Sequence, residues 1–236
     1  MKQFMDICAA MLRIVGMMRH KKSRRDHMPN WCNNSIAFYQ DDGGNAMISA
    51  FYSDIQNYQD CKESETRKSL AWVGHWLQSN GINTDALYSR GFFVGCELYT
   101  DHVRIDMETA WVPLQEVWDL MAEKYGLFYV YIAEEPSCEI YVNTDIEGRF
   151  FATRYAVNFC DIDDLGLNVE MMSMFEERLQ KIGSGMMYFD SFKALAVEFE
   201  KLSFSVADVV SLNKQLAIFN IKVYEYSNER SKPGKS

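Results

Sequence analysis

Hydrophobic and polar residues follow one another in residues 35–132 with the periods of strands and helices. Apolar residues that alternate or cluster predict strands, and apolar residues that recur every three or four positions predict helices. The predicted strands are 35–39, 92–99, 103–109 and 127–132, and the predicted helices are 45–58, 69–81 and 113–125. This order, with one extra helix, is typical of a ferredoxin-like split βαβ fold, in which helices cover one face of an antiparallel sheet.

The clearest strand is 103–109, where polarity alternates at every position. Its apolar positions are Val103, Ile105 and Met107, and its charged positions are Arg104, Asp106 and Glu108. Because successive side chains of a strand point to opposite faces, the sheet is expected to bury one face and expose the other.

The clearest helix is 113–125. Pro113 suits its first turn, and Gly126 suits its C-terminal end. One apolar stripe runs along it, formed by Leu114, Val117, Trp118, Met121 and Tyr125. Trp118 is therefore predicted to be a core residue rather than part of a ligand site.

Two further strands are predicted after residue 132, and the hydrophobic pattern changes after residue 159. Segments 138–143 and 149–159 are predicted to form an added hairpin. Helices are then predicted over 165–181, 191–202 and 206–216, a final strand over 218–226 and a polar tail over 228–236. The predicted fold class is α+β, with a ferredoxin-like domain over 28–159 and a helical C-terminal subdomain over 160–236.

Residues 1–27 are predicted to form an amphipathic helix followed by a basic linker. The segment 4–18 is strongly apolar apart from a single polar stripe. It is too short to span a bilayer, which needs about 20 apolar residues, and Asp6 and Arg13 interrupt it. A helix docked on the rest of the chain, or an upstream extension, is favoured over a helix on a membrane surface.

Charge is unevenly distributed along the 236 residues. Residues 1–27 hold seven of the 24 Lys and Arg and two of the 33 Asp and Glu, a net charge of +5, which leaves −14 on the remainder. An acidic body repels nucleic-acid phosphates and attracts basic proteins. We therefore expect a protein partner and no nucleic acid, with candidate contacts at Glu134, Glu135, Glu139, Asp161, Asp163 and Asp164.

The six cysteines are dispersed without a C-x-x-C pair, which favours reduced, buried thiols. The spacing of the cysteines and histidines indicates neither a metal site nor a cysteine–histidine nucleophile pair; the residues of these types with candidate positions are Cys32, His75, Cys96, His102, Cys138 and Cys160. We expect no metal, no cofactor and no catalytic residue.

The segment Arg90-Gly91-Phe92-Phe93-Val94 resembles the first half of the RNA-recognition signature. Gly95-Cys96-Glu97 then departs from that signature, and the segment falls on the second predicted strand rather than the third. A turn followed by a buried strand is the favoured interpretation.

Two longer motifs stand at the ends of predicted strands. They are Met28-Pro-Asn-Trp-Cys-Asn-Asn34 and Val103-Arg-Ile-Asp-Met-Glu-Thr-Ala-Trp-Val-Pro113, with Trp31, Cys32, Asn34, Thr109, Trp111 and Pro113 as their distinctive positions. Over residues 28–158 the chain resembles the YubB-type ferredoxin-like domain family of uncharacterised phage and plasmid proteins. It departs from that family at Val112, where a small residue is usual, and at 95–101, where a Trp-Gly-Thr-Lys-Trp stretch is expected.

The resemblance implies a phage or plasmid origin, the bacterial cytoplasm as the place of action, and Met28 as the expected start. We predict a non-enzymatic accessory protein that binds a host or element protein through its acidic surface. We do not expect it to bind a membrane. The alternatives are a single-stranded nucleic-acid-binding module on the sheet and an unrecognised hydrolase.

A chain that begins at Met28 is expected to be soluble and to melt close to the full-length protein, because the apolar and basic residues 1–27 lie outside the predicted domain. Thermal unfolding followed by circular dichroism measures this. Aggregation, or a melting temperature lower by more than about 6 °C (roughly 2 kcal/mol for a chain of this size), would place residues 4–18 in the core.

Overall fold

The computed structural model describes residues 30–41, 45–60, 72–158, 186–217 and 221–229, and the chain divides into two units after Asn30. In chain order the described elements are β1 (Trp31–Tyr39), α2 (Ala46–Asp60), α3 (Val73–Ser79), β2 (Gly91–Leu98), β3 (His102–Ala110), α4 (Gln115–Tyr125), β4 (Phe128–Glu135), the 3-10 helix η1 (Pro136–Cys138), β5 (Ile140–Asn143), β6 (Tyr155–Asn158), β7 (Met186–Phe189), α6 (Phe192–Glu200), α7 (Val209–Leu216) and β8 (Lys222–Glu225).

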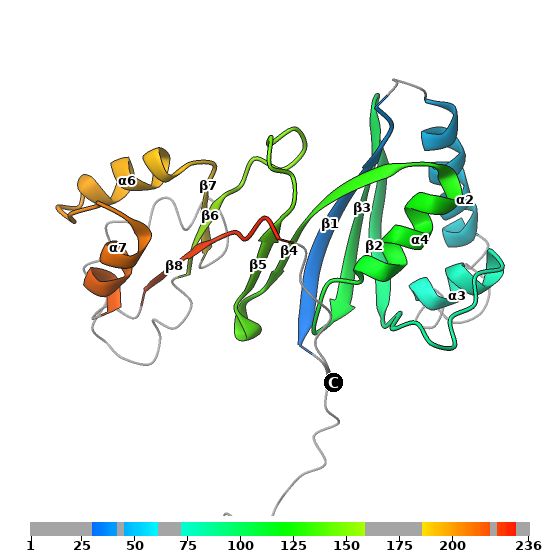
Figure 1. Ribbon diagram of the computed structural model, residues 1–236, viewed down its shortest axis with the longest axis horizontal. Coiled ribbons are helices and arrows are strands. Elements are labelled where there is room, and N and C mark those ends of the chain that lie inside the picture. The colour runs from blue at the N-terminus through cyan, green and yellow to red at the C-terminus, as the bar shows by residue number, and fades with distance from the viewer. Residues whose placement is uncertain (1–29, 42–44, 61–71, 159–185, 218–220, 230–236) are drawn as a thin grey trace, which may run out of the picture. The chain divides into compact units, whose positions relative to one another are not determined.

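These elements build two antiparallel sheets (Figure 1). The first sheet has the strand order β2-β3-β1-β4-β5, and the second has the order β7-β6-β8. All neighbouring strands within them are antiparallel. The α+β class predicted from the sequence is confirmed.

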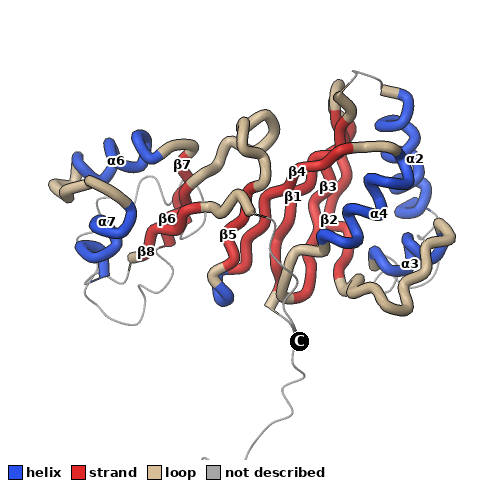
Figure 2. The backbone as a smooth tube through the Cα atoms, in the orientation of Figure 1, coloured by secondary structure: helices blue, strands red, loops and turns tan. Residues whose placement is uncertain are grey.

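Helices α2, α3 and α4 lie on one face of the first sheet (Figure 2). The apolar positions of β3 point to this face, and Val103, Ile105 and Met107 are at most 1% exposed. They join a cluster that also contains Phe51 of α2 and Trp76 of α3. The charged positions of β3 are consequently left on the opposite face, as the alternation predicted.

Strand β1 is longer than the predicted strand 35–39, because it already begins at Trp31. Asparagine has a low strand propensity, which hid the first half of β1 in the sequence. Asn33 and Asn34 nevertheless pair on both sides, with Glu108 and Met107 of β3 and with β4. Pairing with two neighbours overrides the local preference of these residues.

The predicted hairpin of 138–143 with 149–159 is wrong. Strand β5 pairs with β4, whereas β6 pairs with β7 and β8 in the second sheet. The connection between them is folded on itself, because the buried Asp145 carboxylate accepts the backbone N–H groups of Arg149, Phe150 and Phe151. These bonds turn the chain away from β5.

The C-terminal part is not only helical. Its described portion is the sheet β7-β6-β8 with α6 and α7, whose apolar side chains form a separate core cluster. Strand β7 was not predicted, and the predicted helix 165–181 lies outside the described residues. Ser191 and Asp208 cap α6 and α7 with side-chain hydrogen bonds.

Backbone hydrogen bonds near the C-terminus reach the first sheet. Ser227 forms a parallel bridge with Val142 of β5. The N–H of Asn143 donates to the Ser227 carbonyl (2.8 Å), and the N–H of Ser227 donates to the Tyr141 carbonyl (2.9 Å). The outer edge of β5 is thereby occupied.

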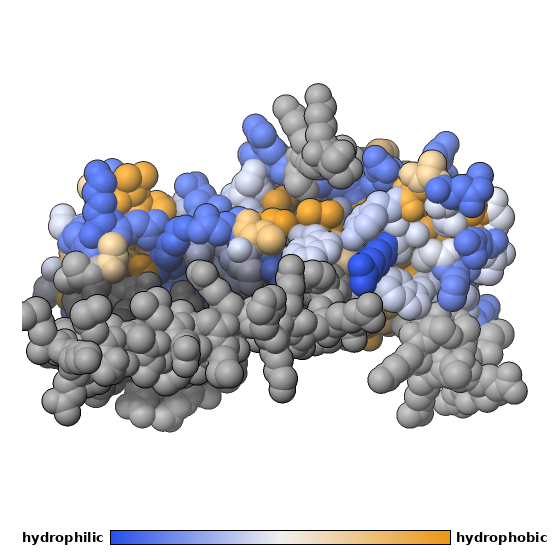
Figure 3. All heavy atoms as spheres, turned by 90° about the horizontal axis from the view of Figure 1, so that it is seen from below, coloured by the Kyte–Doolittle hydropathy of each residue, from blue (hydrophilic) through white to orange (hydrophobic). Residues whose placement is uncertain are grey.

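Among the described helices, none has the length and apolar character needed to cross a membrane. In the view from below, hydrophobic residues appear as separate patches among hydrophilic ones (Figure 3).

The core position predicted for Trp118 is confirmed. Its side chain is fully buried, and the indole Nε1 lies 3.4 Å from Sδ of Met107 on β3. Trp118→Ala is expected to lower the free energy of unfolding by about 3–5 kcal/mol, because it removes a large ring from a packed core. Chemical denaturation measures this. Phe128→Ala, at a ring that is 55% exposed, is the control and should cost less than about 1 kcal/mol.

Candidate functional site on the open sheet face

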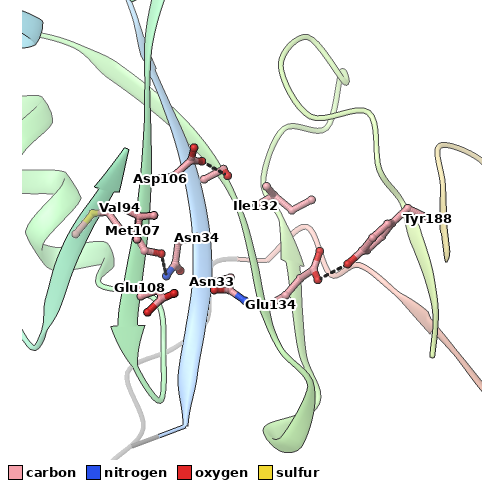
Figure 4. Close-up of a pocket in the computed structure, with 10 residues that line it drawn as sticks. Asn33, Asn34, Val94, Asp106, Met107, Glu108, Ile132, Glu134 and Tyr188 are labelled. Carbon is pink, nitrogen blue, oxygen red and sulfur yellow. Dashed lines mark hydrogen bonds between the residues drawn. The ribbon is translucent and has the colours of Figure 1, made fainter. Parts of the chain in front are cut away.

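The face of the first sheet opposite the helices carries a groove of about 410 Å³ (Figure 4). Polar side chains from three strands line it, together with Tyr188 of β7. Those that decide its chemistry are Asn33 and Ser35 of β1, Asp106 and Glu108 of β3, and Glu134 of β4. The alternation of each strand places these side chains on one surface.

Asp106 is held by neighbours on the same face. The Ser35 hydroxyl donates to its Oδ1 (2.5 Å), and Arg104 Nε donates to the same oxygen (3.1 Å). Arg104 also donates to the Ser35 hydroxyl (3.1 Å). The charge of Asp106 is therefore partly compensated within the sheet.

Glu134 binds two tyrosines of the C-terminal part. The hydroxyl of Tyr188 donates to Oε2 (3.0 Å), and the hydroxyl of Tyr226 donates to Oε1 (Figure 4 for Tyr188). Burial, followed by the nearby negative charge of Glu134, raises the pKa of Tyr226 well above its ordinary value. Tyr226 therefore stays protonated and remains a donor to Glu134.

The side chains of Glu108 and Asn33 form no hydrogen bond or ion pair with the described residues, although both line the groove. Their oxygens are free to accept hydrogen bonds from a ligand. Val94 and Ile132 add apolar surface beside them. Carboxylates next to apolar surface suit a ligand that carries N–H donors on an alkyl stem, such as an arginine or lysine side chain.

The connection between β5 and β6 covers the other end of this face. The guanidinium of Arg149 lies 5.1 Å from the ring centre of Tyr39 on β1 and 4.6 Å from that of Phe150. Arg104 of β3 lies 6.0 Å from the ring centre of Phe151. Contacts between cations and rings thus occupy this end of the face.

Three motif residues meet on the covered face of the sheet. Nδ2 of Asn34 donates to the Cys32 carbonyl (2.7 Å) and to Oγ1 of Thr109 (2.9 Å). Thr109 Oγ1 in turn donates to the Val112 carbonyl (2.8 Å). Burial raises the pKa of the Cys32 thiol to about 12, so this thiol is protonated at neutral pH and has a structural role.

The remaining motif residues shape the turn after β3. Trp111 has φ of +70°, and the N–H of Val112 donates to the Ala110 carbonyl (2.9 Å), which forms a γ-turn of the strained kind. The Trp111 side chain is 40% exposed. Pro113 is buried, and Trp31 packs edge-on against Phe92 at 5.1 Å.

Helix α4 begins at Gln115, two residues after the predicted Pro113. Its N-cap residue is Leu114, which makes no side-chain capping bond. The Thr109 hydroxyl that binds the Val112 carbonyl therefore fixes the chain just before the helix instead of a cap.

The six carboxylates predicted as partner contacts do not form one surface. Glu135 is 2% exposed and accepts the backbone N–H groups of Ser137 (3.3 Å) and Cys138, so it is an N-cap rather than a surface contact. Glu139 is exposed and pairs with Lys222. Asp161, Asp163 and Asp164 lie outside the described residues.

The groove instead brings Glu134 together with Asp106 and Glu108, which were not predicted as site residues. The alternation of strand 103–109 was the signal for them, because it placed both carboxylates on the exposed face.

The described residues contain no cluster of His, Cys, Asp or Glu that could hold a metal ion, and Cys160 is not among them. His102 pairs with Asp101 (2.8 Å) and stacks on Tyr99. Along the pairing of β1 with β3, His102 is seven residue pairs away from the pair that contains Cys32, so the two side chains do not form a nucleophile pair. Burial raises the pKa of the Cys96 thiol to about 12, so it is a poor nucleophile at neutral pH.

The segment Arg90–Val94 lies at the start of edge strand β2, with Phe93 buried among core residues and Phe92 against Trp31. These rings do not line the groove.

No family model matches this chain, and no curated protein or solved structure matches it either.

The bond network of Thr109 generates a stability prediction. Thr109→Val keeps the shape of the side chain but leaves the buried Asn34 amide without one acceptor, so it is expected to cost about 1–3 kcal/mol. Thr109→Ser keeps the hydroxyl and is the control, with a smaller loss. Equal stability of the valine variant and the wild type in urea titrations would contradict a structural role for this network.

Proposed function

We propose that residues 31–143 form a ferredoxin-like protein-binding module, which captures a basic segment of a partner protein in the acidic groove of the open sheet face. The strand order β2-β3-β1-β4 and the helices on a single face support the ferredoxin-like assignment. The fifth strand β5 extends this sheet at the β4 edge.

The observation that carries the proposal is the placement of Asp106, Glu108 and Glu134 along one groove, with Glu108 unpaired among the described residues. The negative charge of residues 28–236 adds a long-range field of the same sign. Such a field speeds the encounter with a basic partner and disfavours acidic ones.

Binding of single-stranded nucleic acid on the open face of the sheet is the weaker candidate function. Modules of that kind stack bases on aromatic side chains of the central strands and attract phosphates with cations. Here Asp106 and Glu108 occupy the central strand β3 on the open face, and they would repel a phosphate backbone.

The origin of the protein in a phage or plasmid, and its action in the bacterial cytoplasm as an accessory protein, are part of the same proposal. They rest on the two motifs that resemble the YubB-type family. Cys32, Asn34 and Thr109 belong to these motifs, and the buried hydrogen bonds that join them support a role of the motifs in the fold.

The experiment compares two double variants of equal charge change. Glu108→Gln/Glu134→Gln removes two groove charges while keeping oxygen acceptors, and Glu116→Gln/Glu123→Gln removes two exposed charges from α4. Association with an arginine-rich peptide is measured by surface plasmon resonance at several salt concentrations. The groove variant should associate about tenfold more slowly and with a weaker salt dependence, and the α4 variant should resemble the wild type.

Two outcomes would reject the proposed function. One is an equal effect of both double variants, which would reduce the groove to part of a general negative charge. The other is tight binding of wild-type protein to single-stranded DNA or RNA at about 150 mM salt together with no binding of the basic peptide.

A further inference from the structure

A second hollow, of about 350 Å³, lies between α3 and the segment that leads into β2. Its wall includes the polar or aromatic residues Trp72, His75, Thr84, Tyr88, Ser89 and Arg90. It shares no lining residue with the acidic groove, so its chemistry is independent of the function proposed above.

Charge distinguishes this hollow. It is lined by Arg90 and His75 and by no carboxylate, whereas the hollows that contain Arg154 and Lys222 each also contain a glutamate. Arg90 forms no ion pair with the described residues. An uncompensated cation in a hollow of an otherwise acidic protein attracts an anion.

Contacts within the protein join the walls of the hollow. A Cβ at Gly74 would lie 2.9 Å from Oγ of Ser89, so glycine lets α3 approach this segment closely. Nε2 of Gln78 donates to Oγ1 of Thr84 (2.9 Å), which ties α3 to the opposite wall. The hydroxyl of Tyr88 donates to the Ala110 carbonyl (3.0 Å) and holds the rim on the end of β3.

The donors and rings of the hollow match two parts of one ligand. Arg90, His75 and Ser89 can donate hydrogen bonds to a phosphate group. Trp72 is half-buried and held edge-on by Phe92, and Tyr88 is 47% exposed, so both offer ring surface to a planar group. The volume is at the lower end of the range for small-molecule sites, about 300–1,000 Å³.

We infer that this hollow binds a small phosphate-bearing planar ligand of mononucleotide size, with the phosphate at Arg90 and the ring beside Trp72 and Tyr88. The guanidinium supplies a charge-assisted, bidentate contact to the phosphate, and the aromatic rings supply stacking. No covalent step is involved.

Isothermal titration calorimetry on the full chain tests this with adenosine 5′-monophosphate, adenosine and inorganic phosphate. The nucleotide should saturate one site with a Kd below about 1 mM, and each fragment should bind about tenfold more weakly or worse. Arg90→Gln should weaken nucleotide binding by about tenfold or more, because it removes a charged hydrogen bond at an exposed position that the fold does not need. Lys193→Gln, which removes an exposed cation from α6, is the matched control and should leave the Kd unchanged.

Three results would overturn the inference. They are the absence of saturable binding by the nucleotide, an unchanged Kd in Arg90→Gln, and binding of single-stranded oligonucleotides without binding of the mononucleotide. Circular dichroism of both variants confirms that any loss is not caused by unfolding. Since neither variant alters the acidic groove, failure here would leave the peptide-binding experiment unaffected.

Discussion

The hydrogen bonds from the Asn34 amide of β1 to Oγ1 of Thr109 and to the Met107 carbonyl, both on β3, hold the central strands of the first sheet in register. A buried amide is costly unless its donors are satisfied, so this register is the one in which Asn34 is paired. The methyl group of Thr109 requires glycine at position 91 on the next strand, since a Cβ there would come within 2.9 Å of it. Asn34 and Thr109 thus link β1, β3 and β2, and Thr109 also binds the Val112 carbonyl in the turn that follows β3.

Residues with a strong local period were predictable. The alternation of β3 and the stripe of α4 determined which side chains are buried, and Trp118 and Met107 lie where those periods placed them. Elements that depend on distant partners were not predictable. Strand β7 is short and pairs with β6, about 30 residues earlier in the chain, and the first half of β1 is polar but paired on both sides. Local propensity carries no information about such partners.

The residues of the candidate site were also only partly predictable from the local sequence. Glu134 and Glu135 are adjacent in sequence and were expected to act together, but neighbouring residues of a strand point to opposite faces. Because β4 continues to Glu135, beyond the predicted end at residue 132, one carboxylate reaches the groove and the other caps η1. Asp106 and Glu108, two residues apart on β3, share a face for the same reason. Acidic residues at consecutive positions of a strand therefore do not form one surface patch, whereas acidic residues at alternate positions lie on the same face.

The bridge between Ser227 and β5 has a consequence for the order in which the chain folds. Without residue 227, the outer edge of β5 is open, and open strand edges pair readily with other chains. The second sheet has the same dependence, because its central strand β6 pairs with β8, about 65 residues later. During synthesis, β5 lacks the partner on its outer edge and β6 lacks β8 until residues 222–227 have been made. Translation of residues 159–227 therefore sets how long these edges are open to pairing with other chains.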